Sequence, residues 1–174
     1  MGNVSMSPAL DTISKRVQFM AENYPDKELF VFYQDGNRDV YTAERMFLLA
    51  GKFANRLRHQ YGFQRNDIIA NTLPNSPERL ITDLGITLAG CVCMNGQVLL
   101  ADGSDFFQSS KNSRCRGVVL RPEEEVAAWR LLKSYVTGDI SSIVTELSCV
   151  KAPDMTTAIL VSRKSNRLRK PLLE

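Results

Sequence analysis

Apolar residues along the central part of the chain follow two alternating spacings, and this alternation predicts the fold class. Helices are expected at 42–61, where apolar residues recur every three or four positions, and at 80–90, where the run is apolar on most sides. Residues 105–113 give a weaker helix signal. Three short apolar runs typical of strands lie at 68–73, 91–94 and 117–120. Strands that alternate with helices predict a largely parallel sheet layer with helices packed on it, an α/β fold.

The flanking segments extend this pattern. Residues 11–24 have helical spacing, with Asp11 as the expected N-cap, and residues 29–41 predict a β-hairpin around Asp35-Gly36. After Leu120 we expect a helix that begins at Pro122, because three consecutive glutamates (123–125) would favour its positive N-terminal end. A final strand is expected at 158–161. The run at 91–94 is expected to be a short buried strand.

The turn at 74–78 should begin the helix that follows the first buried strand. Asn75 or Ser76 is the expected N-cap, and Pro77 suits the first helical turn. A helix start after a strand can bind an anion, but this turn lacks glycines and a Lys-Ser/Thr pair. We therefore expect it to fix the direction of the helix rather than to hold a phosphate.

Length, composition and charge predict one globular domain with a basic tail. The chain has 174 residues, of which 44% are hydrophobic and 24% charged, with a net charge of +3. We expect an irregular N-terminus at 1–10, a folded part at 11–161 and a basic tail at 162–174. The tail has no interleaved aromatic residues, so we interpret it as a solvated linker and not as a nucleic-acid site.

The cysteines and the hydropathy profile predict a cytoplasmic protein. No signal-peptide pattern begins the chain, so the four cysteines are interpreted as reduced core thiols: Cys91, Cys93, Cys115 and Cys149. The spacing of the first two does not fit a zinc site, and the only histidine, His59, lies on a helix face far away in the sequence. No apolar run approaches the ~20 residues of a membrane span, so we expect no membrane partner.

Several short motifs occur in a characteristic order along the central stretch. They comprise a helix start, a helix end, a short strand, a Pro-Asn-Ser-x-Glu turn and an Ala-Gly helix end: Tyr41, Thr42, Leu57, Arg58, Tyr61, Gly62, Asp67, Ile69, Ala70, Pro74, Asn75, Ser76, Glu78, Ala89 and Gly90. Over roughly residues 10 to 161 the chain thus resembles the N-terminal segment of the adenylate-forming (AMP-binding) superfamily, in particular acyl-CoA synthetases. Glu44 lies one position earlier than in the family pattern, and Asn66 replaces a glycine.

The resemblance implies the chemistry of a parent enzyme. Members activate a carboxylic or fatty acid with ATP and Mg²⁺ to an acyl-adenylate, then transfer the acyl group to CoA. They use a Gly/Ser/Thr-rich loop ending in lysine, a Thr-Glu motif, an aspartate for the ribose and a mobile lysine. None of these motifs is found in this sequence; residues 108–111 are nearest in composition but lack glycine. We therefore predict no catalytic, cofactor-binding or metal residue in this chain.

Two functions remain open at this point. The chain is either a truncated N-terminal part of an acyl-CoA synthetase-like ligase, inactive alone and able to associate with the remaining ligase domains, or a non-catalytic α/β protein-interaction module derived from such an enzyme. A module should unfold cooperatively, whereas a fragment should aggregate through exposed edges. An unrelated flavodoxin-like domain would require a cofactor loop after a strand, and we find none.

Overall fold

The computed structural model describes residues 12–34 and 36–161. They divide into two compact units, one that ends at Leu49 and one that begins at Ala50. The predicted irregular N-terminus, Asp35 of the hairpin turn and the basic tail lie outside the described residues. Asp11, the predicted N-cap of the first helix, also lies outside the described residues, and the observed cap is Thr12, whose hydroxyl accepts a hydrogen bond from the Lys15 backbone N–H at 3.2 Å.

The first unit contains one helix and the predicted hairpin. Helix α1 (Ile13–Asn23) precedes β1 (Glu28–Gln34) and β2 (Asn37–Thr42), which pair antiparallel. Helix α2 (Ala43–His59) then begins, and the Thr42 hydroxyl accepts a hydrogen bond from the Arg45 backbone N–H at its start. The Arg45 guanidinium lies 4.1 Å from the Tyr41 ring centre and 2.9 Å from the Asp39 carboxylate. These contacts tie the end of the hairpin to the start of the helix.

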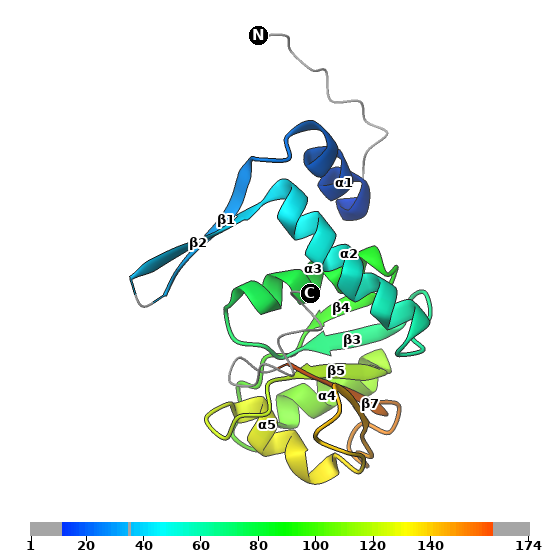
Figure 1. Ribbon diagram of the computed structural model, residues 1–174. Coiled ribbons are helices and arrows are strands. Elements are labelled where there is room, and N and C mark those ends of the chain that lie inside the picture. Colours follow the sequence, from blue (N-terminus) through cyan, green and yellow to red (C-terminus); the bar gives the residue numbers. More distant parts are fainter. Residues whose placement is uncertain (1–11, 35, 162–174) are drawn as a thin grey trace. The chain divides into compact units, whose positions relative to one another are not determined.

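The second unit is built on a five-stranded sheet (Figure 1). Its strands are β3 (Ile68–Asn71), β4 (Val92–Asn95), β5 (Gly117–Leu120), β6 (Val144–Glu146) and β7 (Thr157–Leu160). Their order is β4-β3-β5-β7-β6; the first four are parallel, and β6 runs antiparallel to β7. The connecting helices are α3 (Pro77–Leu88), α4 (Ser104–Ser113) and α5 (Ala127–Leu132), followed by a 3₁₀ turn, η1 (Lys133–Tyr135). The predicted α/β class is therefore confirmed.

Strand order creates a crevice at one edge of this sheet. The connection after β3 leads through α3 to β4 on one side, whereas the connection after β5 leads through α5 toward β6 and β7 on the other. Loops that leave adjacent parallel strands in opposite directions open a space at the carboxyl ends of those strands, where α/β proteins usually bind ligands. The topology thus singles out the carboxyl ends of β3 and β5.

One part of the core lies between the sheet and helices α4 and α5, which cover the same face in Figure 1. Every residue of β5 is buried because the strand is central in the sheet, and Phe106, Trp129 and Leu132 pack against that face. Trp129 is therefore a core residue. The four cysteines are free thiols, three of them buried and Cys93 partly exposed.

Two predicted elements differ in the structure. The strand at 91–94 is not buried: β4 is an edge strand, and Val92 is 47% exposed because no strand of the described residues pairs with its outer side. The helix expected at Pro122 begins only at Ala127. The glutamates before it therefore do not form a first helical turn.

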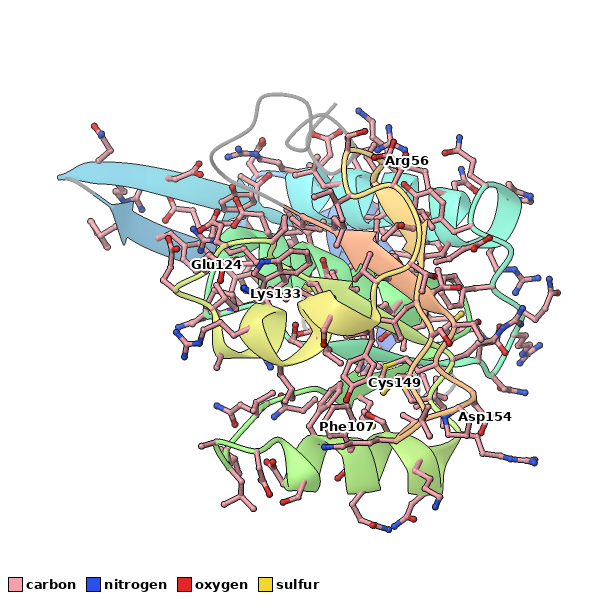
Figure 2. All side chains as sticks on the ribbon, turned by 90° about the horizontal axis from the view of Figure 1, so that it is seen from below. Arg56, Phe107, Glu124, Lys133, Cys149 and Asp154 are labelled. Atoms are coloured by element: carbon pink, nitrogen blue, oxygen red, sulfur yellow. The ribbon has the colours of Figure 1, made fainter. Side chains whose placement is uncertain are left out.

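These glutamates make side-chain pairs instead. Glu123 turns inward and pairs with Arg121 at 2.8 Å, with only 4% of its side chain exposed. Glu124 pairs with Lys133 at 2.7 Å, and Figure 2 shows the two side chains next to α5. Glu124 also accepts a hydrogen bond from the Trp129 indole at 3.3 Å. Glu123 and Glu124 therefore anchor the loop between β5 and α5.

Candidate functional site

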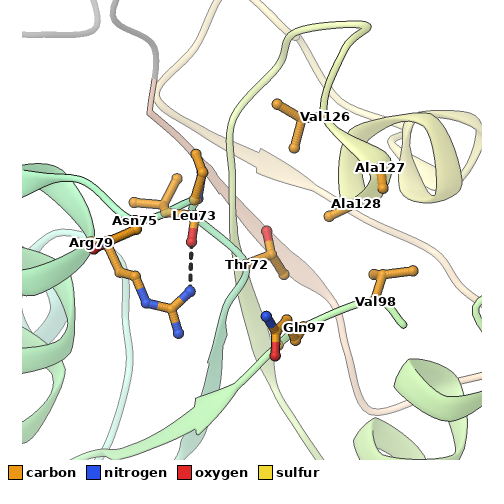
Figure 3. Close-up of a pocket in the computed structure, with 11 residues that line it drawn as sticks. Thr72, Leu73, Asn75, Arg79, Gln97, Val98, Val126, Ala127 and Ala128 are labelled. Carbon is orange, nitrogen blue, oxygen red and sulfur yellow. Dashed lines mark hydrogen bonds between the residues drawn. The ribbon is translucent and has the colours of Figure 1, made fainter. Parts of the chain in front are cut away.

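A pocket of about 420 Å³ lies at the carboxyl ends of β3 and β4, beside the start of α5 (Figure 3). We call it the carboxyl-edge pocket. Its walls come from three loops and the starts of two helices, α3 and α5: Thr72, Leu73, Pro74, Asn75, Arg79, Gly96, Gln97, Val98, Val126, Ala127 and Ala128. The pocket therefore lies at the carboxyl edge of the sheet and shares the end of β3 with the crevice that the strand order predicts.

The first wall is the turn that links β3 to α3. Ser76, and not Asn75, is the N-cap: its hydroxyl accepts from the Arg79 N–H at 3.2 Å, and Pro77 takes the first helical position. Ser76 is buried, whereas Asn75 is exposed at the pocket wall. Capping by the serine thus leaves the Asn75 amide available to a ligand.

Arg79 connects this turn to the end of β4. Its Nη1 donates to the Leu73 carbonyl at 2.7 Å, the bond drawn in Figure 3, and its Nη2 donates to Asn95 Oδ1 at 3.0 Å. Its Nε lies 3.8 Å from Asp83 Oδ2, one turn further along α3. One guanidinium therefore fixes the separation of two pocket walls, although its side chain is still 23% exposed.

The buried side chain of Asn71 fixes the turn between β3 and α3 from the interior of the protein. The side chain is fully buried at the end of β3, and its Nδ2 donates to the Arg79 carbonyl at 3.1 Å and to Asp83 Oδ1 at 2.7 Å. Its Oδ1 accepts from the Leu73 N–H at 3.1 Å. Because a buried amide needs such partners, this network specifies one arrangement of the turn.

The floor of the carboxyl-edge pocket forms where the backbone after β3 lies close to β5 and to the end of β4. Thr72 donates through its hydroxyl to the Val119 carbonyl at 2.6 Å, which links β3 to β5. The Gly96 N–H donates to the Asn71 carbonyl at 3.0 Å. A Cβ on Gly96 would lie 2.7 Å from Thr72 Cγ2 and 3.2 Å from Asn71 backbone atoms. Only glycine at position 96 therefore lets the backbone pass this close to β3 as it leaves β4.

The thiol of Cys93 completes the network behind Arg79. Its Sγ donates to Asp83 Oδ1 at 3.0 Å. Burial, followed by the hydrogen bond to Asp83 and the charge of that carboxylate, raises the pKa of the Cys93 thiol well above its usual range. The thiol is therefore protonated at neutral pH and acts as a hydrogen-bond donor, not as a nucleophile.

We expect Cys93 to react more readily with iodoacetamide when Asp83 is replaced by asparagine. Asp83→Asn keeps an oxygen for the thiol but removes the negative charge that opposes thiolate formation. A fall of one pKa unit should raise the thiolate fraction about tenfold, so alkylation of the folded chain should accelerate to that extent at pH 8. Peptide mapping by mass spectrometry measures the rate. Asp102→Asn, at an exposed loop position, is the control, and an equal acceleration there would refute the assignment.

The pocket can hold a ligand by hydrogen bonds and apolar contact. Arg79 offers a guanidinium, Asn75 and Gln97 offer amides, and Val98 and Val126 offer apolar surface. Within residues 12–34 and 36–161 no group of three His, Cys, Asp or Glu side chains could hold a metal ion. No helix in the described part of the chain is long and apolar enough to cross a bilayer.

The sequence located part of this site without assigning it. The motif residues Pro74, Asn75 and Ser76 do lie together, at the turn that forms one wall. Sequence reasoning missed Arg79 and Gln97. The available signal was that both follow the carboxyl ends of neighbouring parallel strands, where side chains from separate loops meet. The prediction that the chain has no catalytic residue is not tested by this geometry.

Comparison with known proteins identifies the family. The family model described as AMP-binding enzyme matches residues 17–163. No curated protein sequence matches the chain significantly. The match covers most of the chain, including the whole sheet of the second unit and both sides of the carboxyl-edge pocket.

Solved structures share the fold at low sequence identity. A fatty acid AMP ligase from Legionella pneumophila superposes with a TM-score of 0.61 at 16% identity, over 90% of this chain and 25% of that chain. The fatty acyl-adenylate ligase of the same organism, solved with acyl adenylate and pyrophosphate, gives 0.59 at 16% identity, over 92% and 24%. The N-terminal subdomain of NpsA from Klebsiella oxytoca, solved with 3-hydroxyanthranilyl-AMSN, gives 0.55 at 19% identity, over 68% and 28%.

Together these comparisons show how much of a relative the chain covers and which family it belongs to. The chain spans about a quarter of the length of the solved structures that it resembles. At such identities the structural likeness shows the fold, and the family model supplies the relationship. Because the family model matches most of its length, the chain belongs to the AMP-binding enzyme family.

Proposed function

We propose that the chain is the N-terminal part of a ligase that activates a carboxylic acid with ATP to an acyl-adenylate and then passes the acyl group to CoA. Residues 11–161 would form the first part of the AMP-binding domain. The observation that carries the proposal is the family match over 17–163 on a sheet whose crevice lies at the carboxyl ends of β3 and β5. The chain's role is to build and hold one side of the substrate site.

The residues of the pocket suit this role. Arg79 and Asn71 fix the turn after β3 by hydrogen bonds, so the wall is preorganised before a ligand arrives. The Asn75 and Gln97 amides can orient a polar group, and the apolar side chains can exclude water from it. ATP, when bound, supplies the adenylyl group. We assign no ATP, Mg²⁺ or CoA ligand to the described residues and infer that the remaining ligase domains bind these molecules.

If the chain is the N-terminal part of a ligase, its partners are the remaining domains of that ligase. We propose that the chain is inactive alone and associates with the remaining domains of the ligase in the cytoplasm. An edge strand is one surface available for such contact: β4 pairs with β3 on one side only, and Val92 is 47% exposed. The same feature favours the alternative function, a non-catalytic interaction module, because such an edge can also pair with another protein.

Two measurements test the proposal. Sequencing of the native transcript past the codon for Glu174 should reveal a Gly/Ser/Thr-rich loop with a lysine. Acid-dependent exchange of pyrophosphate into ATP should be absent for the 174-residue chain and present for the extended product. A stop codon after Glu174 together with cooperative unfolding of the chain would instead support the interaction module, and exchange by the chain itself would refute inactivity.

A further inference from the structure

A hollow of about 520 Å³ lies at the opposite edge of the sheet from the carboxyl-edge pocket, and we call it the amino-edge hollow. Its walls come from the segments that lead into three neighbouring parallel strands, β3, β5 and β7: Asn66, Asp67, Ile68, Ser113, Arg114, Arg116, Pro153, Asp154 and Thr156. Parallel strands begin at the same edge of a sheet, so polar side chains that are far apart in the sequence gather at this hollow.

Hydrogen bonds fix the three segments relative to one another. The Arg116 N–H donates to the Ile68 carbonyl at 2.8 Å, and the Thr156 N–H donates to the Arg116 carbonyl at 3.1 Å. On the β3 side, one carboxylate oxygen of Asp67 accepts from the Gln64 N–H at 2.6 Å and from Arg116 Nη1 at 2.7 Å. The hollow is therefore formed before a ligand arrives, and the charges of Asp67 and Arg116 offset each other.

Three other side chains of the hollow have no protein partner within residues 12–34 and 36–161: the Asn66 amide, the Arg114 guanidinium and the Asp154 carboxylate. All three residues are exposed, and Asp154 is labelled in Figure 2. Arg114 lies on the segment before β5 and Asp154 on the segment before β7, and these two strands are adjacent. The hollow therefore presents one positive and one negative charge from neighbouring segments.

Two of these side chains are held at the hollow by an unusual backbone conformation. Asn66 has a φ of +69° and Arg114 a φ of +54°, and within the described chain they are the only residues other than glycine with a positive φ. Arg114 is the C-cap of α4, next to the position where glycine is common because the left-handed conformation costs it little. An arginine in this conformation is strained, and strain of this kind is often found at binding sites.

We propose that the amino-edge hollow binds a small zwitterion of the amino-acid type, with its carboxylate on the Arg114 guanidinium and its ammonium group on the Asp154 carboxylate. The inference goes beyond the proposed function and does not rest on it. A ligand that carries both charges is favoured over a simple anion, which Asp154 would repel, and over a simple cation, which Arg114 would repel. Ile68 and Pro153 add apolar surface to the hollow, which suits an aliphatic side chain.

The first test measures binding of L-leucine to the full chain by calorimetry. N-acetyl-L-leucine lacks the ammonium group and L-leucinamide lacks the carboxylate, so each should bind about tenfold more weakly because it loses a charged hydrogen bond. Asp154→Asn should likewise weaken L-leucine binding about tenfold. It should not weaken binding of N-acetyl-L-leucine, because that compound has no ammonium group for Asp154 to accept from.

Arg114→Gly separates binding from folding. Glycine relieves the left-handed strain, so the variant should melt about 2–4 °C higher than the parent chain. It should nevertheless bind L-leucine about tenfold more weakly, because the guanidinium is absent. Arg65→Gln, at an exposed position outside the hollow, is the matched control and should bind L-leucine as the parent chain does.

Three results would overturn the inference. Unchanged L-leucine affinity in an Arg114→Gly variant that melts higher would show that Arg114 only caps α4. Equal affinity for L-leucine and N-acetyl-L-leucine would exclude the contact with Asp154 and leave a simple anion site. Absence of L-leucine binding at millimolar concentration would refute the site as a whole.

Discussion

Replacement of Gly103 by alanine should lower the free energy of unfolding by about 3 kcal/mol. Gly103 has a φ of +67°, in the left-handed region that costs other residues roughly 1–2 kcal/mol. The added Cβ would also lie 2.2 Å from Leu131 Cδ2, and overpacking of this kind costs about 1–3 kcal/mol. Urea denaturation followed by circular dichroism measures the loss.

Gly62→Ala separates the two causes. Gly62 has nearly the same φ, +72°, but a Cβ there would meet nothing within 4 Å. It should therefore lose only the conformational part, about 1 kcal/mol. Equal losses in the two variants would show that Leu131 moves aside without cost, and that the contact between Gly103 and α5 adds nothing to the stability of the fold.

Replacement of Asn71 by alanine should cost about 3 kcal/mol and loosen the wall of the carboxyl-edge pocket. The substitution removes two hydrogen bonds donated by the side chain, to Asp83 and to the Arg79 carbonyl, and one accepted from the Leu73 N–H. Groups left without partners in the interior each cost about 1–3 kcal/mol, and more when charged. Thermal and urea unfolding measure the change in stability.

Hydrogen exchange of the Leu73 amide reports the local part of this effect. It should be protected in the parent chain and exchange faster in the Asn71→Ala variant, beyond what the global loss of stability explains. Asn55→Ala is the control, since Asn55 is exposed on α2 and surface substitutions usually change stability by less than about 0.5 kcal/mol. A comparable loss at Asn55 would refute the special role of the buried amide.

Several elements were predictable because their signals are local. The helix at 80–90 and the strand at 117–120 carry strong apolar patterns, and Ser76-Pro77 is a capping sequence whose geometry depends only on its neighbours. The parallel class followed from alternation, since parallel strands need crossover connections. The Pro-Asn-Ser turn was placed correctly between strand and helix because its signal also lies in neighbouring residues.

Other elements depended on distant contacts. Three glutamates after Pro122 predict a helix start, but Glu123 pairs with Arg121 and Glu124 with Lys133, and the helix begins at Ala127. The residues of β6 have no apolar run and become a strand because β7 offers an edge. A contiguous apolar run at 91–94 predicts burial, yet only the strand order shows that β4 lies at the edge.

The sequence by itself determined the α/β alternation, the capped turn at 74–78 and the resemblance to AMP-binding enzymes, because each depends on residues close together in the chain. Only the tertiary structure decided that the loops after β3 and β4 and the start of α5 enclose one cavity. That arrangement depends on strand order, which joins residues such as Arg79 and Asn95 across 16 positions of sequence. Hydrophobic periodicity specifies which face of a strand is buried, but it does not specify which strand lies beside it.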